Sequence, residues 1–210
     1  MSPASQGARD PFLDPVSGVL RNRLGITDEA MLRQAEADFS AARLAQLHRH
    51  PLAGAYDLRH LCGFHARIFG DVYPWAGEIR TVSISKEDPF CLPQHISSFA
   101  VQVFTRLTAA DRLKGRGRED FLDGLTELLA DLNALHPFRE GNGRTQRAFC
   151  SQLAREAGHH IRWALMDPRE NIPASRASLR GDNEALRCLL ERVDDRADPS
   201  SVAPQPRPPG

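Results

Sequence analysis

Hydrophobic residues recur at helical spacing through most of the chain between residues 27 and 193. The first such stretch predicts a helix that Thr27 caps and that ends near His48, ahead of Pro51. We expect its buried face to consist of Leu32, Ala35, Phe39 and Ala42. A second helix is predicted over residues 57–69, with one side formed by Leu58, Leu61, His65, Ile68 and Phe69.

The middle of the chain predicts two more helices and one stretch of a different kind. Residues 77–85 alternate between polar and apolar side chains, which is typical of a short strand. Asp88 and Pro89 break that pattern, so we expect a hairpin or flap there. A helix is predicted to start near Pro93. The next, over about 119–134, is apolar nearly all round its inner half and should therefore be central.

Three further helices are predicted over about 142–157, 168–180 and 182–193. Gly158 is a natural residue to end the first of them. The predicted fold class is therefore all-α, a compact helical bundle with a small β-hairpin flap. Residues 1–24 are predicted to form an irregular N-terminal arm, 25–195 the domain, and 196–210 a Pro-rich disordered tail or linker.

Composition narrows the class of partner. Lys and Arg together number 27, as do Asp and Glu, so the net charge gives no argument for a nucleic-acid partner, and no direct nucleic-acid binding is expected, although a local basic patch stays open. No apolar run approaches the ~20 residues that span a bilayer, and the first residues show no secretory signal. We therefore expect no membrane partner and a cytoplasmic location, with a secreted effector as the alternative. The four cysteines form no CxxC pair, which favours a reducing compartment.

Candidate chemistry is concentrated in residues 136–147, HPFREGNGRTQR. Pro137 ends the preceding helix at His136, because the residue before a proline avoids the α region. The sequence Gly141-Asn142-Gly143 then opens the next helix. Glycines at a helix start let backbone N–H groups converge on an anion.

The charged side chains of this segment suit a polyphosphate. Arg144 and Arg147 lie three residues apart in the first turns of the predicted helix, and two guanidinium groups bind several phosphate oxygens well. Glu140 offers a hard oxygen ligand for Mg²⁺ on those phosphates. His136 has an ordinary pKa near neutrality and can act as a general base. Each feature alone is more often structural, but all of them converge within twelve residues.

The segment also resembles a known family. HPFREGNGRTQR matches the Fic signature HPFx(D/E)GNGRxxR at every fixed position, and residues 71–77, DVYPWAG, resemble the stretch that precedes the Fic flap. The likeness covers about residues 10–195 and implies the Fic fold. Related Doc-type kinases replace the second glycine of the nest with lysine, whereas this chain keeps Gly143. The resemblance therefore favours AMP transfer over phosphorylation.

The resemblance implies a role for each matching residue. His136 would be the catalytic base that deprotonates a target hydroxyl, and Glu140 would hold Mg²⁺. ATP, the co-substrate, would be bound through its phosphates by Gly141, Asn142, Gly143, Arg144 and Arg147. The flap would dock the target chain through Ile79, Thr81, Val82, Ser83, Ile84 and Lys86. Phe138 would anchor the loop in the core.

The implied function is a protein adenylyltransferase, a nucleotidyltransferase that moves AMP from ATP to a hydroxyl side chain. Similar short bacterial proteins are toxins acting on type II topoisomerases, DNA gyrase and topoisomerase IV. The alternatives are a translocated effector with another target, UMP or phosphocholine transfer, and a non-catalytic interaction module. Self-inhibited relatives carry a helix with the pattern (S/T)xxxE(G/N), and residues 83–88 and 178–183 match it only imperfectly. The resemblance therefore implies a small antitoxin that inhibits in trans by offering a glutamate to Arg147.

Overall fold

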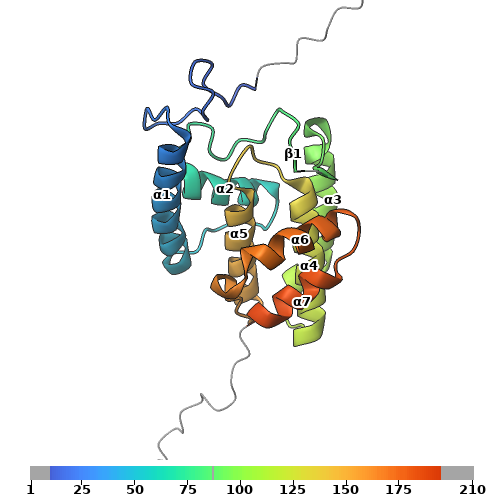
Figure 1. Cartoon of the computed structure of the whole chain (residues 1–210). Helices are drawn as coiled ribbons and strands as arrows, with labels where there is room; N and C mark the ends of the chain where they lie inside the picture. The colour runs from blue at the N-terminus through green and yellow to red at the C-terminus, as the bar shows by residue number, and fades with distance from the viewer. Residues whose placement is uncertain (1–9, 87, 195–210) are drawn as a thin grey trace, which may run out of the picture.

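Seven α-helices dominate the computed structural model, which describes residues 10–86 and 88–194 (Figure 1). The helices are α1 (Glu29–Arg49), α2 (Leu58–Phe69), α3 (Ile96–Ala109), α4 (Arg118–Leu135), α5 (Asn142–Glu156), α6 (Pro168–Leu179) and α7 (Glu184–Val193). Three single 3₁₀ turns are η1 (Pro93–His95), η2 (Asp111–Leu113) and η3 (Trp163–Leu165). The all-α prediction is confirmed.

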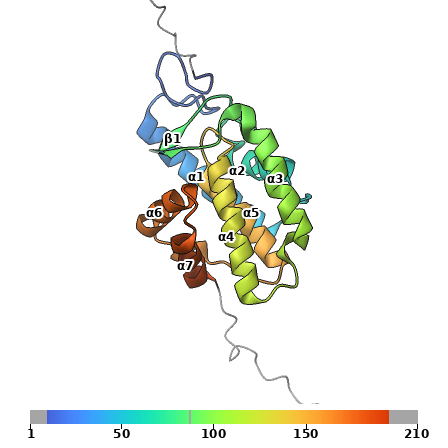
Figure 2. The same ribbon diagram turned by 90° about the vertical axis from the view of Figure 1, so that its right-hand side faces the viewer.

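Helix α4 lies at the centre of the fold, as its apolar circumference predicts. It contacts α3 on one side, α6 and α7 on the other, and α5 as well (Figure 2). Leu122, Leu125 and Leu132 are fully buried in it. Because α4 is surrounded on several sides, the loop that follows it at residue 136 is held between neighbouring elements rather than in solvent.

The buried face of α1 differs from the predicted one. The N-cap is Asp28, whose carboxylate accepts a hydrogen bond from the Met31 amide, and not Thr27. The residues that face the core are Leu32, Glu36, Ser40 and Leu47, whereas Phe39 is 40% exposed. Apolar spacing did not predict this face because two of its residues are polar and bind partners on α5 and after α2, described below.

The segment after α2 is also different from the prediction. Residues 77–84 form no strand, so the predicted strand over 77–85 is wrong. Among the described residues the strands are two residues long, β1 (Ser85–Lys86) and β2 (Asp88–Pro89), paired antiparallel with Ser85 opposite Pro89. The Arg80 amide bonds to the Pro137 carbonyl at 2.9 Å instead of to a neighbouring strand. This backbone pairs with the site loop and therefore has no ladder partner.

The N-terminal arm packs on the core within its described part. Phe12 is buried and meets Trp75 edge-on, with ring centroids 5.3 Å apart. The division of the chain at residue 25 stays a prediction, and the predicted tail at 196–210 lies outside the described residues. Within residues 10–86 and 88–194, no helix has both the length and the apolar character to cross a bilayer.

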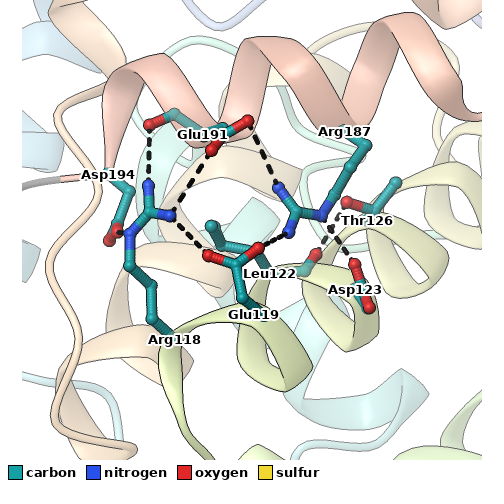
Figure 3. Close-up of polar contacts among 8 residues, drawn as sticks. All are labelled: Arg118, Glu119, Leu122, Asp123, Thr126, Arg187, Glu191 and Asp194. Atoms are coloured by element: carbon teal, nitrogen blue, oxygen red, sulfur yellow. Dashed lines mark hydrogen bonds and ion pairs between the residues drawn. The ribbon is translucent and has the colours of Figure 1, made fainter.

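Helix α7 is fastened to the start of α4 by a cluster of ion pairs (Figure 3). Arg187 lies 2.6 Å from both Glu119 and Asp123, and Arg118 lies 2.8 Å from the buried carboxylate of Asp194. Gly181, with φ 88°, ends the turn after α6. The N-cap of α7 is Asn183, and Asp182 accepts a bond from the Glu184 amide.

Candidate active site

Most of the predicted chemical residues line one cleft of about 630 Å³, whereas Gly141 and Arg144 are not among its lining residues. His136, Glu140, Asn142, Gly143 and Arg147 all line it. The opposite side comes from η3 and the residue after it and from α6 and α7, which contribute apolar, polar and one basic side chain: Trp163, Met166, Asn171, Ile172, Ser175, Arg176, Leu179 and Leu186. Segments far apart in the chain therefore meet at the end of α4.

His136 stands at the C-cap of α4 in a left-handed conformation, with φ 40° and ψ 60°. Pro137 disfavours the right-handed α region for the residue before it, so the helix cannot continue through this position. The imidazole Nδ1 lies 3.2 Å from the Asn133 carbonyl oxygen, which can only accept. Nδ1 therefore carries the proton in the neutral ring, and Nε2 carries the lone pair that a general base needs.

The loop from 137 to 141 is braced by buried hydrogen bonds. The Asn142 side chain accepts from the Phe138 amide at 2.9 Å and donates to the Phe138 carbonyl at 2.8 Å. Asn142 therefore fixes the loop with its side chain and leaves its backbone amide available to an anion. Phe138 is 1% exposed, which agrees with its predicted role as an anchor.

His65 of α2 supports the same loop from below. Its Nδ1 accepts from the Gly77 amide at 2.7 Å, so its Nε2 carries the proton and donates to the Glu140 carbonyl at 3.0 Å. The ring also stacks on Phe138, with centroids 3.9 Å apart. Burial lowers the pKa of His65 to about 4, against a smaller raising effect of the bond to Glu140. His65 is therefore a neutral strut at physiological pH, a role that helical spacing alone did not indicate.

The start of α5 has the backbone geometry that the predicted anion-binding turn requires. Thr145 is the first residue whose amide bonds to the carbonyl four residues earlier, that of Gly141, at 3.1 Å. The amides before it have no acceptor within the helix and carry its partial positive charge. Gly141 has φ 80°, and a Cβ there would lie 2.4 Å from the Phe69 ring, so the position requires glycine.

The two motif arginines lie in different surroundings. Arg147 lines the cleft and passes over Gly143, where a Cβ would be 3.3 Å from its Nη1. Burial, with a smaller effect of the Arg144 charge, lowers the pKa of Arg147. Among the residues that the structure describes, no carboxylate lies within ion-pair distance of it. An anion in the cleft would provide the missing countercharge.

Arg144 instead faces α1. It donates to Glu36 and, at 3.1 Å, to the Ser40 hydroxyl, and its guanidinium lies 4.8 Å from the Phe69 ring centroid. Glu36 also accepts a hydrogen bond from the Tyr73 hydroxyl. Burial, followed by this bond, raises the pKa of Tyr73. Glu36 was missed in the sequence because it interrupts the apolar spacing of α1.

Glu140 is half exposed at the rim of the cleft. Its Oε1 accepts from the Gly141 amide at 2.8 Å and lies 3.9 Å from Arg144. Within the described residues there is no group of three or more His, Cys, Asp or Glu that could hold a metal. A single carboxylate fits Mg²⁺, because Mg²⁺ is commonly bound by one or two carboxylates together with substrate phosphates.

The predicted flap residues are placed unevenly. Ile84 lines the cleft, Ile79 and Val82 pack against the core, and Thr81 and Ser83 are exposed. Lys86 lies in β1, and its side chain is not among those described. Two residues at the ends of this segment were not singled out in the sequence for the site: Arg80 donates to the His136 carbonyl, and Phe90 stacks on the His136 ring.

Comparison with known proteins identifies the family. Residues 55–154 match the Fic/DOC family. The chain is 42% identical over 188 residues to protein adenylyltransferase VbhT of Bartonella schoenbuchensis, covering 89% of this chain and 39% of that protein. It is 35% identical over 190 residues to "Probable protein adenylyltransferase Fic" of Salmonella typhimurium, covering 90% of this chain and 94% of that protein.

A solved structure gives the same result for the fold. The N-terminal Fic domain of a VirB-translocated Bep effector protein from Bartonella quintana, with bound ADP, superposes with a TM-score of 0.82 at 27% identity. The match covers 89% of this chain and 95% of that one. The predicted resemblance, to a family whose relatives are named as adenylyltransferases, is confirmed, and this chain belongs to the Fic/DOC family.

Proposed function

We propose that this chain is a protein adenylyltransferase that transfers AMP from ATP to a hydroxyl side chain of a target protein. One observation carries the proposal. An imidazole, an acidic side chain, the open amides of a helix start and an arginine without a described carboxylate partner line one cleft. This combination suits a polyphosphate and a nucleophile that must lose a proton.

The proposed reaction uses His136 as the base. Its Nε2 accepts the proton of the target hydroxyl, and the hydroxyl oxygen attacks the α-phosphorus of ATP. A new P–O bond forms, the bond to the β-phosphate breaks, and pyrophosphate leaves. The amides of Asn142 and Gly143, together with Arg147, stabilise the negative charge of the departing phosphates, and the Gly141 amide joins them where Glu140 turns from it to Mg²⁺.

Arg144 has a more indirect place in this proposal. Its contacts with Glu36 and Ser40 direct it toward α1, so it contributes its positive charge from beside Glu140. Direct binding of a phosphate oxygen by Arg144 would require a partner exchange with Glu36. Glu140 would hold Mg²⁺ jointly with the phosphates of ATP. When bound, that ion would neutralise phosphate charge.

The remainder of the cleft fits the nucleoside part of ATP. The side formed by η3, the residue after it and α6 has the apolar residues Met166, Ile172 and Leu179, and Asn171, Ser175 and Arg176 supply polar groups. Ligand sites commonly combine an apolar lining with a few polar groups in this way. Residues 79–86 would hold the target chain beside His136, in part by strand-like main-chain pairing.

Transfer of label from α-labelled ATP tests the function. The purified chain, Mg²⁺ and a bacterial lysate should give labelled protein bands, and γ-labelled ATP should give none. Glu140→Ala should raise the Mg²⁺ concentration required for half-maximal rate, and an unchanged requirement would remove Glu140 from the metal site. Absence of transfer from either ATP would favour the second candidate function, a Fic fold used only for binding.

We further propose that the chain is a toxin restrained by a small antitoxin in trans, with cytoplasmic type II topoisomerases, DNA gyrase and topoisomerase IV, as targets. The imperfect internal pattern supports a separate inhibitor, because Gly181 and Asp182 form the turn between α6 and α7. Expression in bacteria should slow growth, and His136→Ala should relieve it. A marked gain of activity in Asp182→Gly would place the inhibitor within this chain.

A translocated effector with another target is the alternative. The observation that favours it is the fold match to VirB-translocated Bartonella proteins. Mass spectrometry of labelled lysate proteins distinguishes the two. Topoisomerase subunits labelled in bacterial lysate support the toxin, whereas a labelled protein found only in a eukaryotic lysate supports the effector.

A further inference from the structure

We propose that Arg80 and Phe90, at the two ends of the flap segment, are positioning residues that fix the backbone and the ring plane of His136. The proposal rests on the function proposed above, in which His136 is the base. Neither residue lies in the motif at 136–147, and neither was expected to touch it. Arg80 contacts the backbone carbonyl of His136, and Phe90 contacts its imidazole ring.

The Arg80 guanidinium joins three separate pieces of backbone. Its Nε donates to the His136 carbonyl at 2.8 Å, its Nη1 to the Val82 carbonyl at 2.8 Å, and its Nη2 to the Cys91 carbonyl at 2.5 Å. The Arg80 amide also donates to the Pro137 carbonyl at 2.9 Å. One side chain therefore ties the start of the flap, the end of the flap and the C-terminus of α4 together.

Burying the Arg80 cation costs free energy of solvation, which indicates a functional role for the side chain. Arg80 is 1% exposed, and within residues 10–86 and 88–194 no carboxylate forms an ion pair with it. Desolvation lowers its pKa, because removing a cation from water disfavours the charged form. A buried charge that only carbonyl dipoles compensate is uncommon, since most buried charges are paired. The planar guanidinium provides a fork of donors that lysine cannot reproduce.

The hydrogen bond from Arg80 restrains the backbone of His136. A left-handed conformation is unfavourable for a residue other than glycine and persists only where its surroundings impose it. Here the His136 amide donates to Leu132 at 3.0 Å, its carbonyl accepts from Arg80, and Pro137 follows. Arg80 therefore helps to hold the turn that directs the imidazole into the cleft.

Phe90 acts on the ring itself. The two rings are stacked with centroids 3.7 Å apart and an angle of 16° between their planes. Phe90 is 7% exposed. The amide of the next residue, Cys91, donates a hydrogen bond to the Ala134 carbonyl of α4 at 2.9 Å. The phenyl ring limits rotation of the imidazole about its bond to Cβ and covers one of its faces. The hydrogen bond from the His136 Nδ1 to the Asn133 carbonyl also limits this rotation.

The test compares Phe90→Leu and Arg80→Lys with the matched controls Phe99→Leu on α3 and Arg106→Lys, which pairs with Asp131 at the surface. The first measurement is the chemical shift of the His136 ring protons, assigned by their loss in His136→Ala. A stacked phenyl ring shields these protons, so Phe90→Leu should move them downfield, and Phe99→Leu should not. This measurement needs neither ATP nor a target.

The second measurement is the rate of label transfer from α-labelled ATP into lysate protein at varied ATP concentration. Phe90→Leu and Arg80→Lys should lower the maximal rate by about 10²-fold, the usual cost of misplacing a reacting group by about 1 Å. The ATP concentration for half-maximal rate should change little, because neither side chain binds phosphate. Thermal unfolding identifies any variant that fails to fold, and Phe90→Leu keeps the test decisive if Arg80→Lys does not.

The outcomes separate this inference from the function on which it rests. An unshifted His136 ring in Phe90→Leu, or a wild-type maximal rate in both variants, would overturn the positioning roles. A parallel loss of ATP affinity would do so too, because it would show general damage to the cleft. If the wild-type chain transfers no AMP while the ring shift occurs as expected, the proposed function is wrong and the contact with His136 stands.

Discussion

The cleft has two walls that are held by different forces. The loop wall consists of residues 136–143 with their supports His65 and Arg80, and the helical wall consists of α6 and α7. In the loop wall, buried side chains donate to or accept from backbone groups at 2.5–3.0 Å, as with His65 at Glu140 and Arg80 at His136. Such bonds are costly to break because they would leave buried polar groups without partners.

The helical wall relies on packing and on exposed charges. Leu186, Leu189 and Leu190 of α7 are buried, while its polar face joins α4 through Arg187 (Figure 3). Arg192 joins α7 to α6 and lies 2.5 Å from Glu170. The acidic partners of Arg187 are between 44% and 67% exposed. Exposed pairs contribute little and are screened by salt.

This difference matches what each wall must do. A general base and an anion-binding turn need a fixed geometry, because misplacement of a reacting group costs rate. A wall that covers a nucleotide has to admit and release it, which favours contacts that can be rearranged at small cost. We therefore expect substitutions in the loop wall to affect chemistry strongly, and substitutions in the helical wall to have small, salt-dependent effects.

The largest effect is expected for His136→Ala. Loss of a general base typically lowers the rate about 10²–10⁴-fold, while ATP binding should change little because the phosphates contact α5 instead. Transfer of label and calorimetric binding of ATP measure the two properties separately, with the exposed His160→Ala as the control. A matching collapse of ATP affinity would show that the proposed division between base and phosphate site is wrong.

The next effect concerns the pH dependence of stability. His65 is fully buried and its pKa is about 4, against 6.5 for an ordinary histidine. Between these values the unfolded chain binds a proton at residue 65 and the folded chain does not, so the free energy of unfolding falls as pH decreases through this window. The neutral, buried His65 therefore contributes about 3 kcal/mol to the free energy of unfolding relative to its value at low pH. This contribution is fully present above pH 6.5 and is lost as the pH falls toward 4.

Urea unfolding at pH 7 and pH 4 measures this difference. His65→Gln is the matched variant, because glutamine keeps one donor and one acceptor and does not titrate. We expect wild type to lose more stability than His65→Gln over the same pH interval. Equal losses would mean that residue 65 takes up its proton in the folded state, and the neutral strut would be wrong.

The sequence predicted the elements better than their contacts. The helix expected over 142–157 is observed as Asn142–Glu156, because its signals, Gly141 before it and Gly158 after it, act locally. The turn at His136 was predictable for the same reason. Spacing also placed both arginines on one helix, but it could not show that Glu36 would engage Arg144, since that contact joins residues 108 apart.

The wrongly predicted strand at 77–85 also depends on contacts that are distant in the sequence. Its alternating pattern is real, yet a strand also requires a partner strand, and here the backbone bonds to Pro137 and the Arg80 side chain fills the space inside the flap. The polar face of α1 was missed because Glu36 and Ser40 occupy positions where the apolar pattern expects hydrophobic residues. Buried polar residues that serve a site break the periodicity that reveals a fold.

The third effect separates the two arginines of α5. Arg147→Ala should weaken ATP binding by about 10–10²-fold, because a hydrogen bond to a charged group contributes about 1.5–3 kcal/mol. Arg144→Ala should mainly lower stability, by roughly 2 kcal/mol, since it leaves the buried carboxylate of Glu36 without its cation. Calorimetry and urea unfolding distinguish the two, with Arg155→Ala on the same helix as the control.

A second substitution sharpens this comparison. Glu36→Gln in the Arg144→Ala background removes the unpaired charge and should recover part of the lost stability without changing ATP affinity. If Arg144→Ala instead lowers ATP affinity as much as Arg147→Ala does, Arg144 exchanges Glu36 for phosphate during binding, and its proposed indirect place is wrong.

The smallest effect is expected in the helical wall, for Arg187. Its guanidinium is 2.6 Å from Glu119 and from Asp123, but these carboxylates are 67% and 66% exposed, so water already solvates them well. Such pairs contribute about 0.2–1 kcal/mol, and the screening length falls to about 3 Å in 1 M salt. Arg187→Met keeps most of the aliphatic stem and removes the charge. It should therefore lower the free energy of unfolding by less than about 1 kcal/mol in 50 mM NaCl, and by still less in 1 M NaCl, as measured by urea unfolding.

Arg80→Lys, the matched loss of a fork of donors in the loop wall, should show the same deficit at both salt concentrations, because its bonds are buried. A large deficit in Arg187→Met that persists in 1 M salt would mean that the two walls are held by the same kind of force.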